Sequence, residues 1–148
     1  MNEQSKLATF FLKPLHQGGI ILALIIVLTL VDNFMPHDDS FFKANAGPWI
    51  VSTAMILLFI IINTVVALRI DNVLPYWSFS IITYLAILAF SYAWCYLLTG
   101  KHIDEVGSFR WLWMVLTMVY LVFFIITRTM KRIMDVAIKQ DKKLRGEE

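Results

Sequence analysis

Four uninterrupted apolar stretches constrain this chain more than any other feature. They cover about residues 18–35, 48–68, 76–99 and 109–127, and each is close to the roughly 20 residues that an α-helix needs to cross a bilayer. Apolar residues occupy nearly every position, so length rather than periodicity decides the assignment. Barrel strands are shorter and alternate in polarity. We therefore expect an all-α, polytopic membrane protein in which residues 1–148 form one bundle of four transmembrane helices.

The composition excludes several other classes of protein. Hydrophobic residues make up 59% of the chain and charged residues 16%, whereas an ordinary soluble domain has about 45–50% and 25%. A soluble domain of this length could not bury the surplus, because small domains leave much of their surface exposed. The single cysteine, Cys95, can form neither an internal disulfide nor a CxxC pair. That excludes four-helix thiol oxidases, whose chemistry needs paired cysteines.

The distribution of lysine and arginine predicts the orientation. With both termini inside, the inner segments hold Lys6, Lys13, Arg69 and the seven cations of the tail, and the outer loops hold only Lys43, Lys101 and Arg110. Cytoplasmic loops carry the excess of cations, so we expect both termini in the cytoplasm and the protein in the cell (inner) membrane. Aromatic residues are favoured at membrane interfaces. We expect an outer belt formed by Trp49, Trp94, Tyr96, Trp111 and Trp113. We expect an inner belt formed by Tyr76 and Trp77.

Amphipathic segments flank the four spans. Leu7, Phe10, Phe11 and Leu15 follow helical spacing and predict a short interfacial helix that ends near Pro14. In the basic tail, residues 128–148, the spacing i, i+3, i+4, i+7, i+8 places five apolar residues on one helix face. They are Met130, Ile133, Met134, Ala137 and Ile138.

The tail predicts partners as well as structure. No proline or glycine interrupts residues 109–145, so the fourth helix should continue straight into the cytoplasm. Its apolar face would then make helix–helix contacts in a homo-oligomer or with another membrane protein. Its cations should attract anionic lipid at the cytoplasmic face of the bilayer. No aromatic interleaving or binding motif accompanies them, so we expect no nucleic acid partner.

No Asp, Glu, Lys, Arg or His lies near the middle of any span, and Asp32 is the deepest of these residue types. Coupled multidrug antiporters need a membrane-embedded carboxylate, and a haem site needs histidines on facing helices. His16, His37 and His102 lie in flanks or loops. We therefore expect no catalytic residue, metal or cofactor, and no enzyme, because no nucleophile with its base is present.

Two polar features leave alternatives open. Asn63 could contact a buried polar substrate such as a lipid phosphate, but an interhelical hydrogen bond is the interpretation we favour. The outer loops could bind a divalent metal through imidazole and carboxylate groups, although solvated charge is the simpler interpretation. The acidic and histidine residues concerned are Asp32, His37, Asp38, Asp39, His102, Asp104 and Glu105.

Four short helices also give a layout that is similar to the small flippases of the GtrA type, which act on polyprenyl-linked sugars. Those proteins carry Asn-rich, aromatic and basic signatures at their helix ends. This chain has only Asn63, Arg69, Thr127 and Arg128 at such ends, and the signature itself is missing. The likeness is one of topology and transfers no residue role. The function we expect is therefore a non-catalytic subunit or scaffold of a membrane assembly. The alternative is a small transporter or flippase for a lipid-linked or small polar solute.

Overall fold

A computed structural model describes residues 13–34, 46–70 and 73–146 of the chain. They form four helices and, over these ranges, no strand: α2 (Pro14–Phe34), α3 (Gly47–Arg69), α4 (Val73–Thr99) and α5 (Phe109–Leu144). Each helix is long and apolar enough to cross a membrane, which indicates a multi-pass membrane protein. The expected interfacial helix with Leu7, Phe10 and Phe11 lies outside the described residues.

Three of the helices have a proline in the first turn, and this explains why two of them begin earlier than expected. Pro14 is the first residue of α2, Pro48 the second of α3 and Pro75 the third of α4. The first-turn amides of a helix have no partner within it, so proline loses nothing there. The carbonyl of Lys13 accepts bonds from the amides of His16 and Gln17. Pro14 therefore begins a spanning helix, and Leu15 belongs to this helix rather than to the expected interfacial one.

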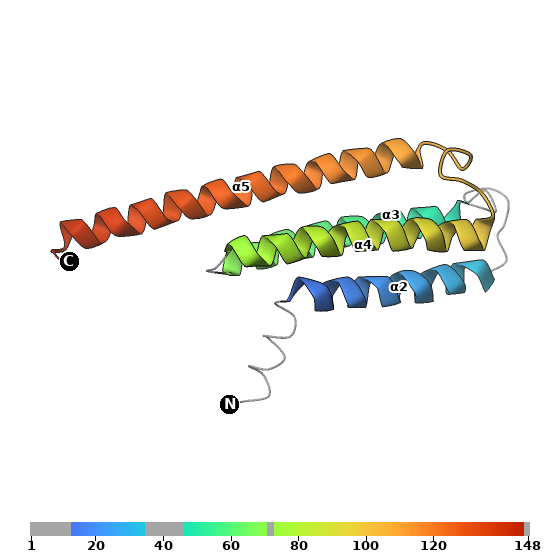
Figure 1. Cartoon of the computed structure of the whole chain (residues 1–148), viewed down its shortest axis with the longest axis horizontal. Helices are drawn as coiled ribbons and strands as arrows, with labels where there is room; N and C mark the ends of the chain where they lie inside the picture. Colours follow the sequence, from blue (N-terminus) through green and yellow to red (C-terminus); the bar gives the residue numbers. More distant parts are fainter. Residues whose placement is uncertain (1–12, 35–45, 71–72, 147–148) are drawn as a thin grey trace, which may run out of the picture.

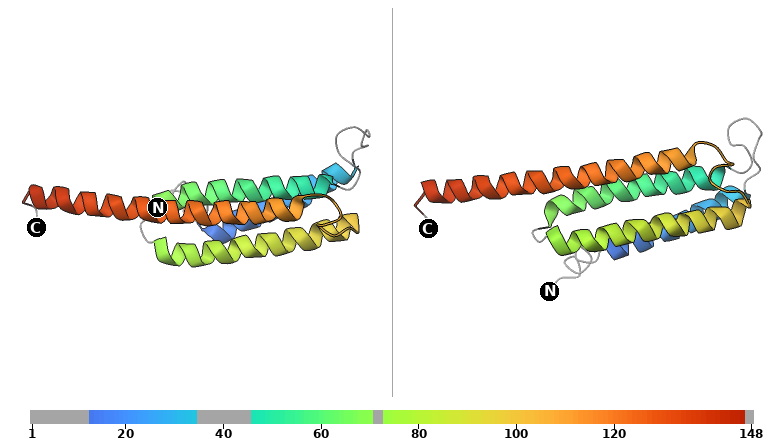
Figure 2. Two further views of the ribbon diagram at one scale, coloured as in Figure 1. Left: turned by 90° about the horizontal axis from the view of Figure 1, so that it is seen from above. Right: turned by 45° about the horizontal axis from the view of Figure 1, so that its top comes forward.

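The helices run alternately up and down, side by side (Figure 1). α2 packs against α3 and α4, and α3 also packs against α4 and α5. The views of Figure 2 show α5 lying along α3 and then continuing beyond the other helices. The end of the bundle from which α5 projects is the extension end; α2 and α4 begin there and α3 finishes there. The opposite end is the loop end. This antiparallel order brings Lys13, Arg69 and the cations of the second half of α5 to one end.

Close contact between α2 and α4 depends on Gly18. A Cβ atom added there would lie 2.2 Å from Cγ2 of Thr83, a distance at which one of the helices would have to shift. Neighbouring Gly19 has nothing within 4 Å of the same added atom. Of these two adjacent glycines, only Gly18 is required for helix packing.

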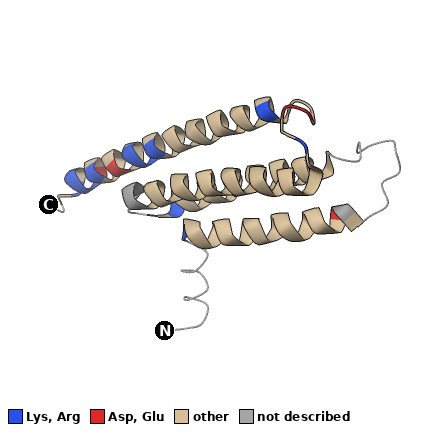
Figure 3. Cartoon of the chain, turned by 45° about the vertical axis from the view of Figure 1, so that its right-hand side comes forward, with Lys and Arg blue, Asp and Glu red and all other residues tan. Residues whose placement is uncertain are grey.

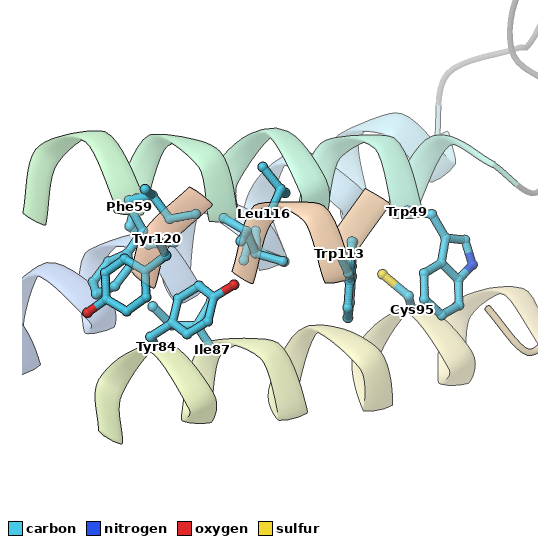
Figure 4. Packing of buried hydrophobic residues seen from close by; sticks show 12 residues of the cluster. Trp49, Phe59, Tyr84, Ile87, Cys95, Trp113, Leu116 and Tyr120 are labelled. Carbon is cyan, nitrogen blue, oxygen red and sulfur yellow. The ribbon is translucent and has the colours of Figure 1, made fainter. Parts of the chain in front are cut away.

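The core contains aromatic residues that the sequence placed at the membrane surface. Trp49 is 0% exposed and Trp113 is 9% exposed, whereas Trp111 is 67% exposed. In Figure 4, Trp49 and Trp113 lie on either side of Cys95, inside the packed helices. The outer belt is therefore wrong for Trp49 and Trp113, and their burial is possible because their indole N–H groups find acceptors on neighbouring helices.

α5 is one continuous helix of 36 residues, as the lack of proline and glycine predicts. In its first part Trp113, Leu116, Tyr120 and Thr127 are buried. From Arg132 to Leu144 every residue is exposed, and Figure 1 shows this part projecting past the extension end. At a rise of 1.5 Å per residue these 13 residues cover about 20 Å. We call residues 132–144 the extension.

Candidate functional site

Tryptophan–threonine hydrogen bonds join the helices near the loop end. Each of three indole N–H groups donates to the hydroxyl of a threonine on a different helix. The pairs are Trp94 with Thr29 at 2.9 Å, Trp113 with Thr53 at 2.8 Å and Trp49 with Thr99 at 3.4 Å. Each threonine hydroxyl donates its own proton to the carbonyl four residues earlier in its helix. Its lone pairs then remain available, so one hydroxyl satisfies a buried indole without leaving a donor unused.

Asn63 connects all four helices nearer the extension end. Its Nδ2 group donates to Oε1 of Gln17 on α2 at 3.3 Å and to the hydroxyl of Tyr76 on α4 at 3.2 Å. Its Oδ1 atom accepts a hydrogen bond from Ser80 on α4. Because that bond uses the only Ser80 proton, the hydroxyl of Tyr120 on α5 donates to Ser80 in turn. We call these five residues the Asn63 cluster.

Little hydrogen-bonding capacity remains on Asn63 for a substrate. The side chain is 3% exposed, and the cluster uses both of its donors and one lone pair of its oxygen. The cavity beside it, lined by Asn63, Thr64, Trp77 and Tyr120 among others, holds about 10 Å³. That is about the space that one water molecule occupies. The arrangement favours the interhelical interpretation of Asn63.

Aromatic contacts support α5 on both sides of the cluster. The rings of Tyr84 and Tyr120 stack with centroids 4.5 Å apart, and Figure 4 shows them facing each other. The Tyr84 hydroxyl also lies 2.9 Å from the Thr117 hydroxyl of α5. Toward the extension end, Trp77 and Phe124 have centroids 3.7 Å apart. Side chains of α4 thus hold the first part of α5, and no sequence pattern identifies these pairs.

Of the acidic and histidine residues expected to cluster at the loop end, His102 and Asp104 have separate partners. His37, Asp38 and Asp39 lie outside the described residues. The Nδ1 atom of His102 is 3.1 Å from the Tyr92 hydroxyl, and Asp104 pairs with Arg110 at 3.4 Å. Glu105 is exposed. Within the described part of the chain, no three His, Cys, Asp or Glu side chains come close enough to hold a metal ion.

Asp32 lies against the start of α3. A Cβ atom added to Gly47, the first residue of α3, would be 1.9 Å from Oδ2 of Asp32, so the carboxylate can approach this backbone only because residue 47 is glycine. A negative charge at a helix N-terminus interacts favourably with the helix dipole. The position of Asp32 therefore has a structural explanation that does not involve a metal.

The apolar face of the α5 tail is a candidate surface for interaction. Met130, Ile133, Met134 and Ile138 are between 49% and 62% exposed, and Ala137 is exposed as well. Lysine and arginine gather along the same part of α5 (Figure 3), mostly on the opposite side of the helix. Residues of the extension have no burying contact with the rest of the described chain, so this face is open to a partner.

Comparison of the chain with models of protein families, with curated proteins and with solved structures gives no match. The functional argument therefore depends on the contacts and exposed surfaces of the chain itself.

Proposed function

We propose that this protein is a non-catalytic subunit or scaffold of a membrane assembly and that it joins another chain through the apolar face of the α5 tail. One observation carries the proposal. A straight, uninterrupted helix leaves the packed part of the molecule with Met130, Ile133, Met134, Ala137 and Ile138 exposed on one face. Exposed apolar surface is unfavourable by about 25 cal/mol per Å², and a contact with another helix would remove it.

The proposal places the extension end in the cytoplasm, at the inner face of the cell membrane. Nine of the described cations lie at or beyond this end, and only Lys101 and Arg110 lie near the loop end. Cytoplasmic segments carry such an excess. In that orientation the extension stands in water, where a partner is needed to cover its apolar face, and its cations attract anionic lipid at the nearby bilayer surface.

The transporter alternative receives less support from the geometry. A carrier needs a polar site with room for its solute, usually near the middle of the membrane. The donors of Asn63 are used by Gln17 and Tyr76, and the cavity beside it holds about 10 Å³. The Asn63 cluster is therefore better suited to fixing the register of four helices than to binding a solute.

The test is the mass of the protein after extraction of the full chain in mild detergent. The double substitution I133E/I138E places two charges on the apolar face and should release the partner or the second copy, which reduces the measured mass. K139Q/K142Q lowers the net charge by the same two units on the polar face, so its mass should equal that of the parent. If I133E/I138E keeps the mass and the co-purifying chains of the parent, the proposal is wrong.

A further inference from the structure

A stripe along the outer side of α5 changes from apolar to basic where the helix leaves the packed part of the molecule. Met118, Leu121, Ile125, Arg128 and Arg132 are separated by steps of three or four residues, which places them on one line along a helix. The three apolar members are 66%, 43% and 62% exposed. The stripe thus offers an apolar track followed by two guanidinium groups.

The basic end of this stripe is hollowed. An open hollow of about 420 Å³ is lined by Arg128, Thr129, Arg132, Ile133 and Val136. One turn of helix separates the two arginines, so their side chains can reach the same group. Arginine presents a planar fork of N–H donors that suits phosphate oxygens.

Both arginines remain available for an anion. Over the ranges that the structure describes, no carboxylate pairs with Arg128 or Arg132, and the ion pair near the end of α5 joins Arg145 to Asp141. Arg128 lies 5.9 Å from the centroid of the Trp77 ring. That ring is 6% exposed and packs on Phe124, so it forms a fixed surface beneath the guanidinium group.

We propose that this stripe binds one anionic phospholipid of the inner leaflet. Its phosphate lies between Arg128 and Arg132, and an acyl chain lies along Met118, Leu121 and Ile125. The inference relies on the membrane orientation in the proposed function, but it does not depend on the contact made by the apolar face of the tail. Charge complementarity favours a lipid with net negative charge over a zwitterionic lipid, although both carry a phosphate.

The experiment uses the full chain in nanodiscs of phosphatidylcholine mixed with phosphatidylglycerol, and native mass spectrometry counts the lipids that stay bound. The parent should retain phosphatidylglycerol in preference to phosphatidylcholine. In R128Q/R132Q this preference should fall on the order of tenfold, given the usual attraction of a juxtamembrane cation. K142Q/K143Q removes the same charge farther along α5 and should keep the preference of the parent.

Three results would overturn the proposal. R128Q/R132Q could keep the preference of the parent, which means that the arginines do not select the lipid. K142Q/K143Q could lose as much preference, which means that the attraction is a general property of the basic tail. Inorganic phosphate could displace the lipid at low concentration, which means that the apolar track contributes nothing and the site is one for a free anion. R128Q/R132Q should also keep the mass of the parent assembly, so failure of this inference and failure of the proposed function give different results.

Discussion

From Phe109 to Thr127, α5 buries one side against the other helices, whereas from Arg132 to Leu144 it is exposed on every side. The backbone is the same continuous helix in both parts. An isolated helix of fewer than about 12–15 residues is marginal in water, so the extension depends on the packed part to supply its first turns. The difference teaches that packing fixes the position of the first part, while the second part is stable only as the continuation of the first.

The largest expected effect on stability separates two tryptophans of α5, one buried and one exposed, that lie two residues apart. Trp113→Ala should lower the free energy of unfolding by about 3–5 kcal/mol, because it removes a buried ring and leaves a cavity. It also deprives Thr53 of the indole donor. Trp111→Ala, at a side chain 67% exposed, should change the free energy of unfolding by less than about 0.5 kcal/mol. Unfolding by SDS titration measures both, and equal losses would contradict the burial of Trp113.

A smaller effect should follow from removing one hydroxyl in the packed part. Tyr120→Phe keeps the ring that stacks on Tyr84 but removes the bond to Ser80. The expected loss is about 0.5–1.5 kcal/mol, the usual net value of one buried hydrogen bond. Tyr92→Phe removes a hydroxyl that bonds to His102 in an exposed position and serves as the control. A Tyr120→Phe protein as stable as the parent would show that the Asn63 cluster does not hold α5.

The smallest effect is expected in the extension. Ala137→Gly should weaken the local helix by up to about 1 kcal/mol and should speed amide exchange between residues 134 and 144. The midpoint of SDS unfolding should not move, because no packed residue is touched. Exchange measured by mass spectrometry on the full chain gives the result. Equal exchange in both proteins would contradict the conclusion that the extension is held only as the continuation of the packed part.

The positions of the four helices were largely predictable, because length and apolarity alone identify a stretch that can cross a membrane. The continuity of α5 was predictable for a related reason, since no residue in it breaks a helix. The start of the first span was predicted too late, because proline can either finish or begin a helix and the local sequence does not decide between them. The structure resolves this by placing Pro14 in the first turn of α2.

Helix faces were not predictable from the sequence. When nearly every residue of a span is apolar, the periodicity that separates a buried face from an exposed one is lost. Asn63 was recognisable as a costly polar residue, but nothing in the sequence connects it with Gln17 or with Ser80 and Tyr120. Trp113 and Trp111 look alike in sequence, but Trp113 is the one that packs on Trp49 and donates its indole N–H to Thr53 of α3.

The continuity of α5 has a mechanical consequence. Packing holds the helix as far as Thr127, which is buried, and 17 residues separate that point from Leu144, a length of about 26 Å. With no hinge between them, a tilt of about 10° at this pivot would move the tip by about 4 Å, given that length. The helix therefore acts as a lever, and small rearrangements among the apolar helices would reach a partner on the tail as larger displacements.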